Sequence, residues 1–333
     1  MTTFQDCSVG LVKEVTYGTA LTVARWFEFL EETLDYNKGI KQGEGLRVSS
    51  RVARSARRVI TTSDVGGDFS MECLSKGMGL LWEQCMGTGL STLVSGTTYQ
   101  QNFTLADTMP SATWQKGLPR FDGTVDAYTY AGVTVDSWEL EFGNGEIAQL
   151  KVTLDGKEVT TATGYAAPSY ATGANLMHFA NGSLATGAFT APTTTVVASA
   201  ATPLTNVRSG NIKVTHNQNA DRYNFGGAGK KAKPSVGLRE ISGSLTVEYD
   251  SATFRDAVLN DTPMSLVLTF TGGALSVGNE TLQVALPEIK FDGKLPTANG
   301  GEEILVEMEF MALDNLSAAS PIWVVARTAD AAL

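Results

Sequence analysis

The sequence predicts a mainly β protein built from two similar halves. Three observations lead to this expectation. Apolar and polar residues alternate with a period of two in many short runs, which Gly, Pro, Asn and Asp clusters separate. The chain has 333 residues, of which 43% are hydrophobic and 18% charged, enough for a sizeable core and about two domains. A pattern of strand, short helix and strand pair occurs twice in the same order.

The clearest strand lies at 67–73, where apolar side chains on one face alternate with polar side chains on the other. The apolar face carries Phe69, Met71 and Cys73. The polar face carries Asp68, Ser70 and Glu72. The same alternation predicts further strands at 133–142, 148–154, 264–270 and 303–313.

The repeat begins with this strand, because "GDFSMEC" (67–73) aligns with "GSLTVEY" (243–249). In both copies a segment of helical period follows, at 75–87 and at 251–261. Each copy then continues with a strand, and we align 100–105 with 264–270. Each ends in a hairpin-like pair, over 138–154 and 288–310. Identity between the copies is low, so the order of the elements carries the argument.

The segment between the copies is rich in Ala, Thr, Gly and Pro and almost uncharged. We therefore expect a first module over 1–160, a linker or surface insertion over 161–203, and a second module over 204–333 that ends in a C-terminal tail.

The cysteines and histidines argue against most catalytic and metal chemistry. Cys7, Cys73 and Cys85 lack a CxxC spacing, and the apolar surroundings of the last two favour buried thiols. His178 and His216 lie far apart without an acidic partner at motif spacing. We predict no enzyme, no cofactor and no metal. The chain also lacks an apolar run long enough for a membrane span and a signal-like start, which indicates folding in a cytoplasm.

Positive charge is concentrated in two segments of an acidic chain whose net charge is −10. Residues 36–60 hold seven Lys and Arg against one Glu, a net charge of +6, and residues 221–239 have a net charge of +4. The rest of the chain therefore carries −20. Both basic segments lead into the central strand of their copy, so we expect a long basic loop at 36–66 and a second one at 221–239.

This charge distribution is self-complementary, because a basic loop of one subunit can dock on the acidic body of another and the contact can repeat. Two alternatives remain open: a nucleic-acid patch, which the lack of interleaved aromatic residues disfavours, and a solvated loop without a partner. The arginine spacing within 46–59 fits a helix that forms on docking, and an extended hairpin fits as well.

The chain resembles the tail tube (major tail) proteins of long-tailed, non-contractile bacteriophages, in the class with two copies of the tube module. The opening "GLVKEVTYGTALTVARWFEFLEETLDY" (10–36) is similar to the start of that family. The long charged loop, the Gly-led central strand with its short helix, and the second copy add to the resemblance. The second copy lacks the "EVTYGT" start.

The resemblance implies tandem β-sandwich or half-barrel modules whose inner strands join across subunits into a closed β-barrel ring. Rings stack into a tube through which genomic DNA leaves the capsid without specific binding. Six modules per ring imply three chains with pseudo-six-fold symmetry. A true six-fold ring of this chain is the alternative. The implied partners are further copies, a tape measure protein and the tail tip and terminator proteins, in a virion tail assembled in the host cytoplasm.

Two sets of residues are the expected contact sites. The predicted inter-ring contacts are the basic side chains Arg47, Arg51, Arg54, Arg57, Arg58, Lys230, Lys231 and Lys233. The predicted lumen-facing residues are Asp68, Ser70, Glu72, Ser244, Thr246 and Glu248, for which a strand face on the outside of the tube is the alternative. An acidic lumen repels phosphates and keeps DNA from adhering.

Two other functions compete with a tail tube. One is a different virion component, such as a tail terminator or decoration protein, which caps rather than polymerises. The other is a β-sandwich glycan-binding module or hydrolase, for which Glu141 and Glu146 are the candidate carboxylate pair.

Overall fold

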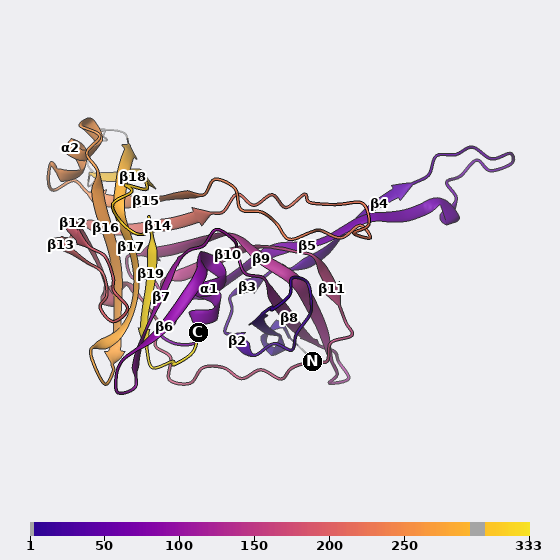
Figure 1. Cartoon of the computed structure of the whole chain (residues 1–333), viewed down its shortest axis with the longest axis horizontal. Coiled ribbons are helices and arrows are strands. Elements are labelled where there is room, and N and C mark those ends of the chain that lie inside the picture. Colours follow the sequence, from indigo (N-terminus) through magenta and orange to yellow (C-terminus); the bar gives the residue numbers. More distant parts are fainter. Residues whose placement is uncertain (1–2, 294–303) are drawn as a thin grey trace.

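The computed structural model describes residues 3–293 and 304–333. Within this part of the chain it is mainly β, with nineteen strands and two α-helices, as the sequence predicts. Figure 1 shows a body of packed sheets from which one long hairpin projects. Neither of the helices in the described residues has the length and apolar character to cross a membrane.

The first half of the chain contains the elements β1 (Ser8–Lys13), β2 (Arg25–Phe27), β3 (Glu31–Glu32), β4 (Asp35–Gln42), β5 (Arg58–Glu72), α1 (Gly79–Met86), β6 (Gly87–Ser95), β7 (Thr98–Leu105), β8 (Ala112–Pro119), β9 (Val125–Gly143), β10 (Gln149–Gly156) and β11 (Glu158–Thr160). The second half contains β12 (Gly182–Thr190), β13 (Ser199–Leu204), β14 (Val207–Thr215), β15 (Glu240–Glu248), α2 (Thr253–Leu259), β16 (Met264–Ala274), β17 (Asn279–Gly293), β18 (Leu305–Ala312) and β19 (Trp323–Thr328).

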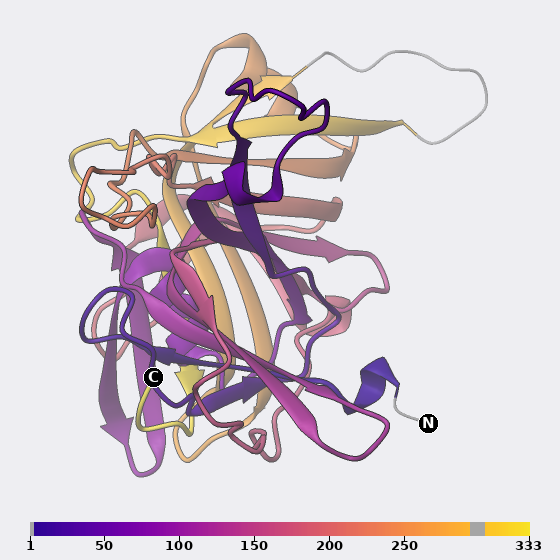
Figure 2. The same cartoon turned by 90° about the vertical axis from the view of Figure 1, so that its right-hand side faces the viewer.

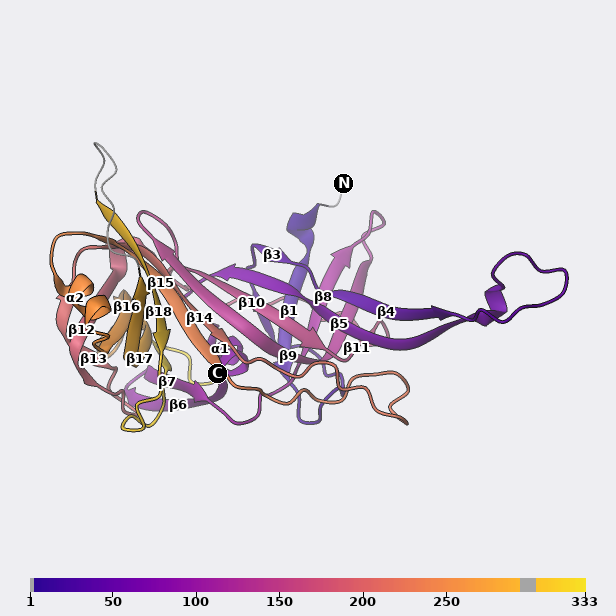
Figure 3. The same cartoon turned by 90° about the horizontal axis from the view of Figure 1, so that it is seen from above.

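Eight strands form one antiparallel layer, which we call the long sheet. Its order is β4, β5, β10, β9, β14, β15, β18 and β17. The hairpin that projects from the body is the far part of β4 and β5 (Figure 3).

Two of the longest strands, β9 and β17, each belong to two layers. The first half of β9 pairs with β8 and β11, and β8 continues through β1 to β2. The first half of β17 pairs with β16 and β19; β16 continues through β12 to β13, and β19 through β7 to β6. The core lies between these outer strands and the long sheet. Figure 2 shows the body from the side on which the hairpin of β4 and β5 projects.

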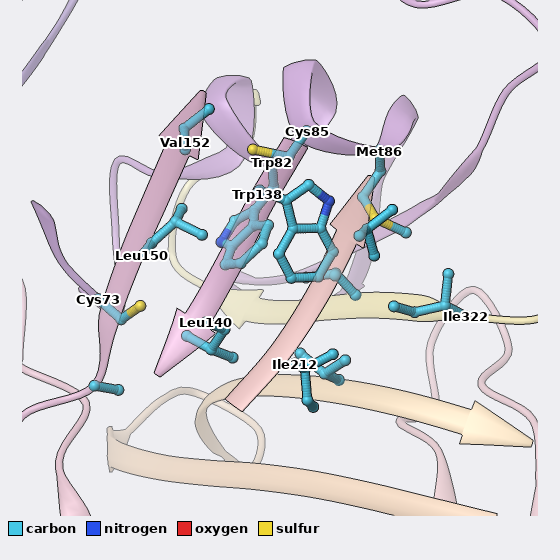
Figure 4. Packing of buried hydrophobic residues seen from close by; sticks show 14 of the residues in the cluster. Cys73, Trp82, Cys85, Met86, Trp138, Leu140, Leu150, Val152, Ile212 and Ile322 are labelled. Atoms are coloured by element: carbon cyan, nitrogen blue, oxygen red, sulfur yellow. The ribbon is translucent and has the colours of Figure 1, made fainter. Parts of the chain in front are cut away.

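The helix α1 closes the core of the first half against β9. Trp82 and Trp138 are fully buried and meet edge to face, with ring centroids 5.5 Å apart (Figure 4). In the second half, α2 makes the same kind of contact with β17 through Phe254 and Phe291, also at 5.5 Å. The prediction that Cys73 and Cys85 are buried thiols is confirmed, and burial raises the pKa of both.

The expected linker has more structure than its composition indicates. Residues 161–203 contain β12 and most of β13, which pair with β16 through β12. Upstream of β12 the chain crosses the first half, where the backbone N–H of Met177 donates to the carbonyl of Cys73 at 2.9 Å. Met177 is fully buried. The small, uncharged residues of this segment therefore allow its extended backbone to pack closely against both halves of the protein.

His216 and Arg239 join the two halves. The Arg239 Nε donates to His216 Nδ1 at 3.1 Å, so His216 Nε2 carries the proton and donates to the carbonyl of Cys85 at 2.8 Å. Arg239 also donates to the carbonyl of Ala106. Burial lowers the pKa of His216 to about 4, and the neighbouring Arg239 charge acts in the same direction against the attraction of Asp136.

This histidine is expected to make the fold sensitive to acid. An unfolded histidine has a pKa of about 6.5, so the unfolded chain binds the proton first, and stability falls as the pH drops from about 6.5 to about 4, by about 3 kcal/mol in all. Urea unfolding of the wild type and His216→Gln between about pH 4.5 and 6 measures this. In the variant, the slope of the free energy of unfolding against pH should be smaller by the equivalent of about one bound proton. Equal slopes would contradict the assignment.

Candidate assembly surfaces

One face of the long sheet is polar from β5 across to β17. Strand register places Glu72, Gln149, Glu141, Asn211, Ser244, Glu309 and Asp292 in a single cross-strand row. The six residues predicted to line a lumen, Asp68, Ser70 and Glu72 with Ser244, Thr246 and Glu248, all lie on this face. Their neighbours along the strands point the other way into the core. The structure thus brings both sets together on one surface.

This polar face is acidic. Its carboxylates are Glu31, Asp68, Glu72, Glu139, Glu141, Glu240, Glu248, Asp292, Glu307 and Glu309. Its basic side chains are Lys151, Arg208, Lys213 and Lys290. Two shallow hollows of about 270 and 400 Å³ lie on it, one on each side of Lys213. Carboxylates outnumber the basic groups, so the face repels polyanions.

The first basic loop is an extended hairpin rather than a helix. We call residues 39–62 the arm, because here β4 and β5 pair only with each other. The hairpin is held as far as Gly43, whose N–H donates to the carbonyl of Arg57 at 2.8 Å. A short 3-10 helix at Ser55–Arg57 and a turn between Arg47 and Ser50 form the tip. Of the two conformations that the arginine spacing allowed, the structure adopts the hairpin.

The arm carries five arginines whose side chains form no hydrogen bond with a described residue. Arg47, Arg51, Arg57 and Arg58 are exposed and Arg54 is half-buried. None of the five forms an ion pair with a described residue, in contrast to Arg120, which pairs with Asp126 at 2.5 Å. Their positive charge is therefore free for an external contact.

The second basic loop is not a second arm, which corrects the equivalence drawn between the two. Lys231 is buried and pairs with Asp155 at 2.5 Å and Asp64 at 3.2 Å. Burial opposes its charge, but these two carboxylates outweigh burial and raise the pKa of Lys231. Lys230 pairs with Glu158. The side-chain charges of Lys230 and Lys231 serve the chain's own fold.

The remaining contacts of this loop fix it against the base of the arm. Ser63 donates its backbone N–H to the carbonyl of Gly229 at 2.9 Å, and Tyr223 donates its hydroxyl to Asp64. Gly229 has φ +72°, and a Cβ there would lie 2.4 Å from the carbonyl oxygen of Thr61. The carbonyl of Lys233 accepts a hydrogen bond from Arg222. Only contacts across strands reveal this role, because basic composition is the same in a free and a docked loop.

The long sheet ends in two unpaired edges, which sequence reasoning did not locate. β4 pairs only with β5, and residues 290–293 of β17 pair only with β18 among the described residues. Open edges present unpaired backbone N–H and C=O groups and are templates for another strand. No pattern in a single sequence marks an edge strand, because the edge is defined by its missing neighbour.

The alternative carboxylate pair does not form a separate site. Glu141 pairs with Lys151 at 2.5 Å on the polar face, and Glu146 is exposed at the turn between β9 and β10.

An acidic sheet face, two open strand edges and a projecting arm are the features of a β protein that assembles through its surfaces. The family model described as phage tail tube protein matches residues 5–312. A comparison with curated proteins gave no match. The chain belongs to the phage tail tube family and is a structural component of a virion tail.

Proposed function

We propose that this chain is the subunit of a tail tube, that it contains two copies of one module, and that three chains close into a ring with pseudo-six-fold symmetry. In this proposal the rings stack into the conduit for genomic DNA, and the acidic polar face lines the lumen. The tape measure, tail tip and terminator proteins are the further partners. The observation that carries the proposal is the joint between β9 and β14.

Repetition of strand pairings supports two modules. Starting from the alignment of Gly67 with Gly243, β4, β5, β10, β9, β8 and β1 correspond to β14, β15, β18, β17, β16 and β12. Every pairing between neighbours in the first series recurs in the second. The correspondence replaces our alignment of 100–105 with 264–270. The counterpart of β16 is β8, and β6 with β7 is a hairpin of the first copy alone.

The two copies are joined edge to edge in the long sheet. The second half of β9, from the first copy, pairs with β14, from the second copy, over seven residues from Ser137 to Gly143. The strand equivalent to β9 is β17, and the strand equivalent to β14 is β4. These are the two strands whose edges are open. Where the strands are described, a neighbouring chain can therefore repeat this joint with Asp292 and Gly293 of β17 against Asn37 and Tyr36 of β4.

The internal joint also fixes the expected register. Ser137 faces Thr215 across it. By the pairings with β10 and β18, Ser137 corresponds to Asp292, and by the pairings with β15 and β5, Thr215 corresponds to Asn37. Asp292 of one chain should thus face Asn37 of the next. Both side chains are exposed and lie on the polar side of their strands.

Cysteine cross-linking tests this ring. In a Cys7→Ser background, whose remaining thiols are buried, Asp292→Cys with Asn37→Cys should yield a covalently closed trimer after mild oxidation. Facing residues of an antiparallel pair lie about 4.5 to 5.5 Å apart between Cα atoms, within disulfide range. Electrophoresis without reductant shows the product.

Two matched variants serve as controls. Ser137→Cys with Thr215→Cys should form the equivalent bond inside one chain. Lys290→Cys with Asn37→Cys shifts the register by two residues and should cross-link poorly. Monomers only, or a stronger signal from the shifted pair, would overturn the joint, and native mass spectrometry of rings with six chains would overturn the trimer.

A further inference from the structure

We infer that the tip of the arm docks into an apolar groove at the opposite end of a second copy of this chain, in the adjacent ring. The inference rests on the proposed tube and names the surfaces that stack it. The occupant is the segment 46–52, and the groove lies between the end of β9, the start of β14 and the strand β12.

The arm tip exposes apolar side chains as well as arginines. Leu46, Val48 and Val52 are 101%, 91% and 83% exposed. Leu46 and Val52 flank the turn between Arg47 and Ser50, Val48 lies within it, and none of the three belongs to a hydrophobic cluster of the described residues. Isolated exposed aliphatic residues are common, but three around one projecting turn form a continuous apolar surface that docking would remove from water.

The groove has the complementary chemistry. Its volume is about 400 Å³, and most of its lining is apolar: Phe142, Phe179, Leu184, Leu204, Val207 and Phe270. Phe179 is 45% exposed, so part of this surface faces solvent. The described residues that line it include no carboxylate, and its one charged member, Arg208, is paired with Glu248 at 2.6 Å.

Carboxylates lie around the groove, and these are the groups with which the arm arginines of another copy can pair. Glu248 flanks it through Arg208, and Asp250 accepts a hydrogen bond at 2.8 Å from Asn206, the residue between Thr205 and Val207. Glu146 lies beside Gly143, which lines the groove, and is exposed. An apolar floor with an acidic rim matches an apolar tip flanked by arginines.

The positions of the two surfaces allow the contact to repeat. The arm leaves the body toward Arg58, the first residue of β5. The groove lies level with the other end of β5, because its lining residue Phe142 follows Glu141, which is in the same cross-strand row as Glu72, the last residue of β5. The fifteen residues of β5 separate the two by roughly 50 Å. Surfaces at opposite ends of one chain give a head-to-tail contact that extends without closing, which excludes the arm's own groove as its target.

Substitution of the apolar residues at the arm tip distinguishes the contact between rings from the formation of each ring. Leu46→Ser, Val48→Ser and Val52→Ser together keep every arginine and change no buried residue. We expect rings of normal mass and unchanged melting, but tubes at least tenfold shorter by negative-stain microscopy. The matched control replaces two exposed apolar residues outside the arm, Val15→Ser with Leu316→Ser, and should leave tube length unchanged.

A cross-link identifies the groove. Val48→Cys with Phe179→Cys, in the Cys7→Ser background, should give disulfide-linked ladders that join successive rings, and peptide mapping should find residue 48 bound to 179. Tubes of normal length from the apolar triple variant, or tubes whose ladder is absent, would overturn the docking site while leaving the tube intact. Absence of rings and tubes from the wild type would instead overturn the proposed function.

Discussion

Tubes assembled from the double variant Glu72→Lys, Glu309→Lys are expected to bind DNA that wild-type tubes leave free. Both side chains lie in one cross-strand row of the polar face, and neither forms an ion pair with a described residue. Reversing them adds six lysines to a ring of three chains. Six phosphate contacts make binding fall by about a thousandfold between 50 and 200 mM salt. Co-sedimentation of short duplex DNA with tubes across that range measures the effect.

Two controls locate the effect. Glu72→Gln with Glu309→Gln removes the carboxylates without adding positive charge and should retain little DNA. Glu28→Lys with Asp314→Lys adds the same charge at exposed positions outside the long sheet and should bind DNA only on the tube exterior, accessible to nuclease. If tubes of the Glu72→Lys, Glu309→Lys variant do not bind DNA, or bind it in a nuclease-sensitive form, that result would contradict a lumen lined by this face.

The second large effect is expected from the arm arginines. Arg51→Ser, Arg54→Ser and Arg58→Ser together should leave rings and melting temperature unchanged, because none of these side chains forms a hydrogen bond or ion pair with a described residue. Stacking should fail. A single exposed ion pair contributes about 0 to 1 kcal/mol, but the contact repeats around each ring, so small losses multiply. Tube length by negative-stain microscopy, measured beside thermal melting, tests this.

Salt and a matched variant complete that experiment. Raised salt should shorten wild-type tubes in part, since screening weakens the exposed charges but not the apolar contact of the tip. Arg120→Ser with Arg255→Ser removes two exposed arginines elsewhere and should leave tube length unchanged. Tubes of normal length from the arm variant would refute the inter-ring role, and a collapsed melting curve would assign the stretch to the fold.

The sequence predicted the strands whose faces differ most in polarity. Alternation is clean at 67–73 and 148–154 because one face of each strand is buried and the other is not, and both segments are strands in the long sheet. The two short helices were also predicted, since their apolar positions return with helical period beside a strand.

Other parts of the fold could not be derived from such patterns. The residues of β12 were expected in a linker, because this strand lies in a partly exposed layer and consists mainly of Gly, Ala and Thr. Apolar and polar residues therefore hardly alternate along it. Lys231 was expected on an external contact because its carboxylate partners, Asp64 and Asp155, are distant in sequence. The groove at Phe142 and Phe179 combines four separate segments, so no local pattern marks it.

The hairpin of β6 and β7 has a consequence for anything that recognises a finished tube from outside. Its strand β7 pairs with the edge of β19, whereas β11, the strand that corresponds to β19 in the proposed first copy, pairs only with β9 among the described residues. In the proposed tube, the exterior would therefore repeat once per chain, whereas the polar face would repeat once per module. On a ring of three chains, an attached decoration or antibody that recognises this hairpin would occupy three equivalent positions, and a molecule inside would pass six.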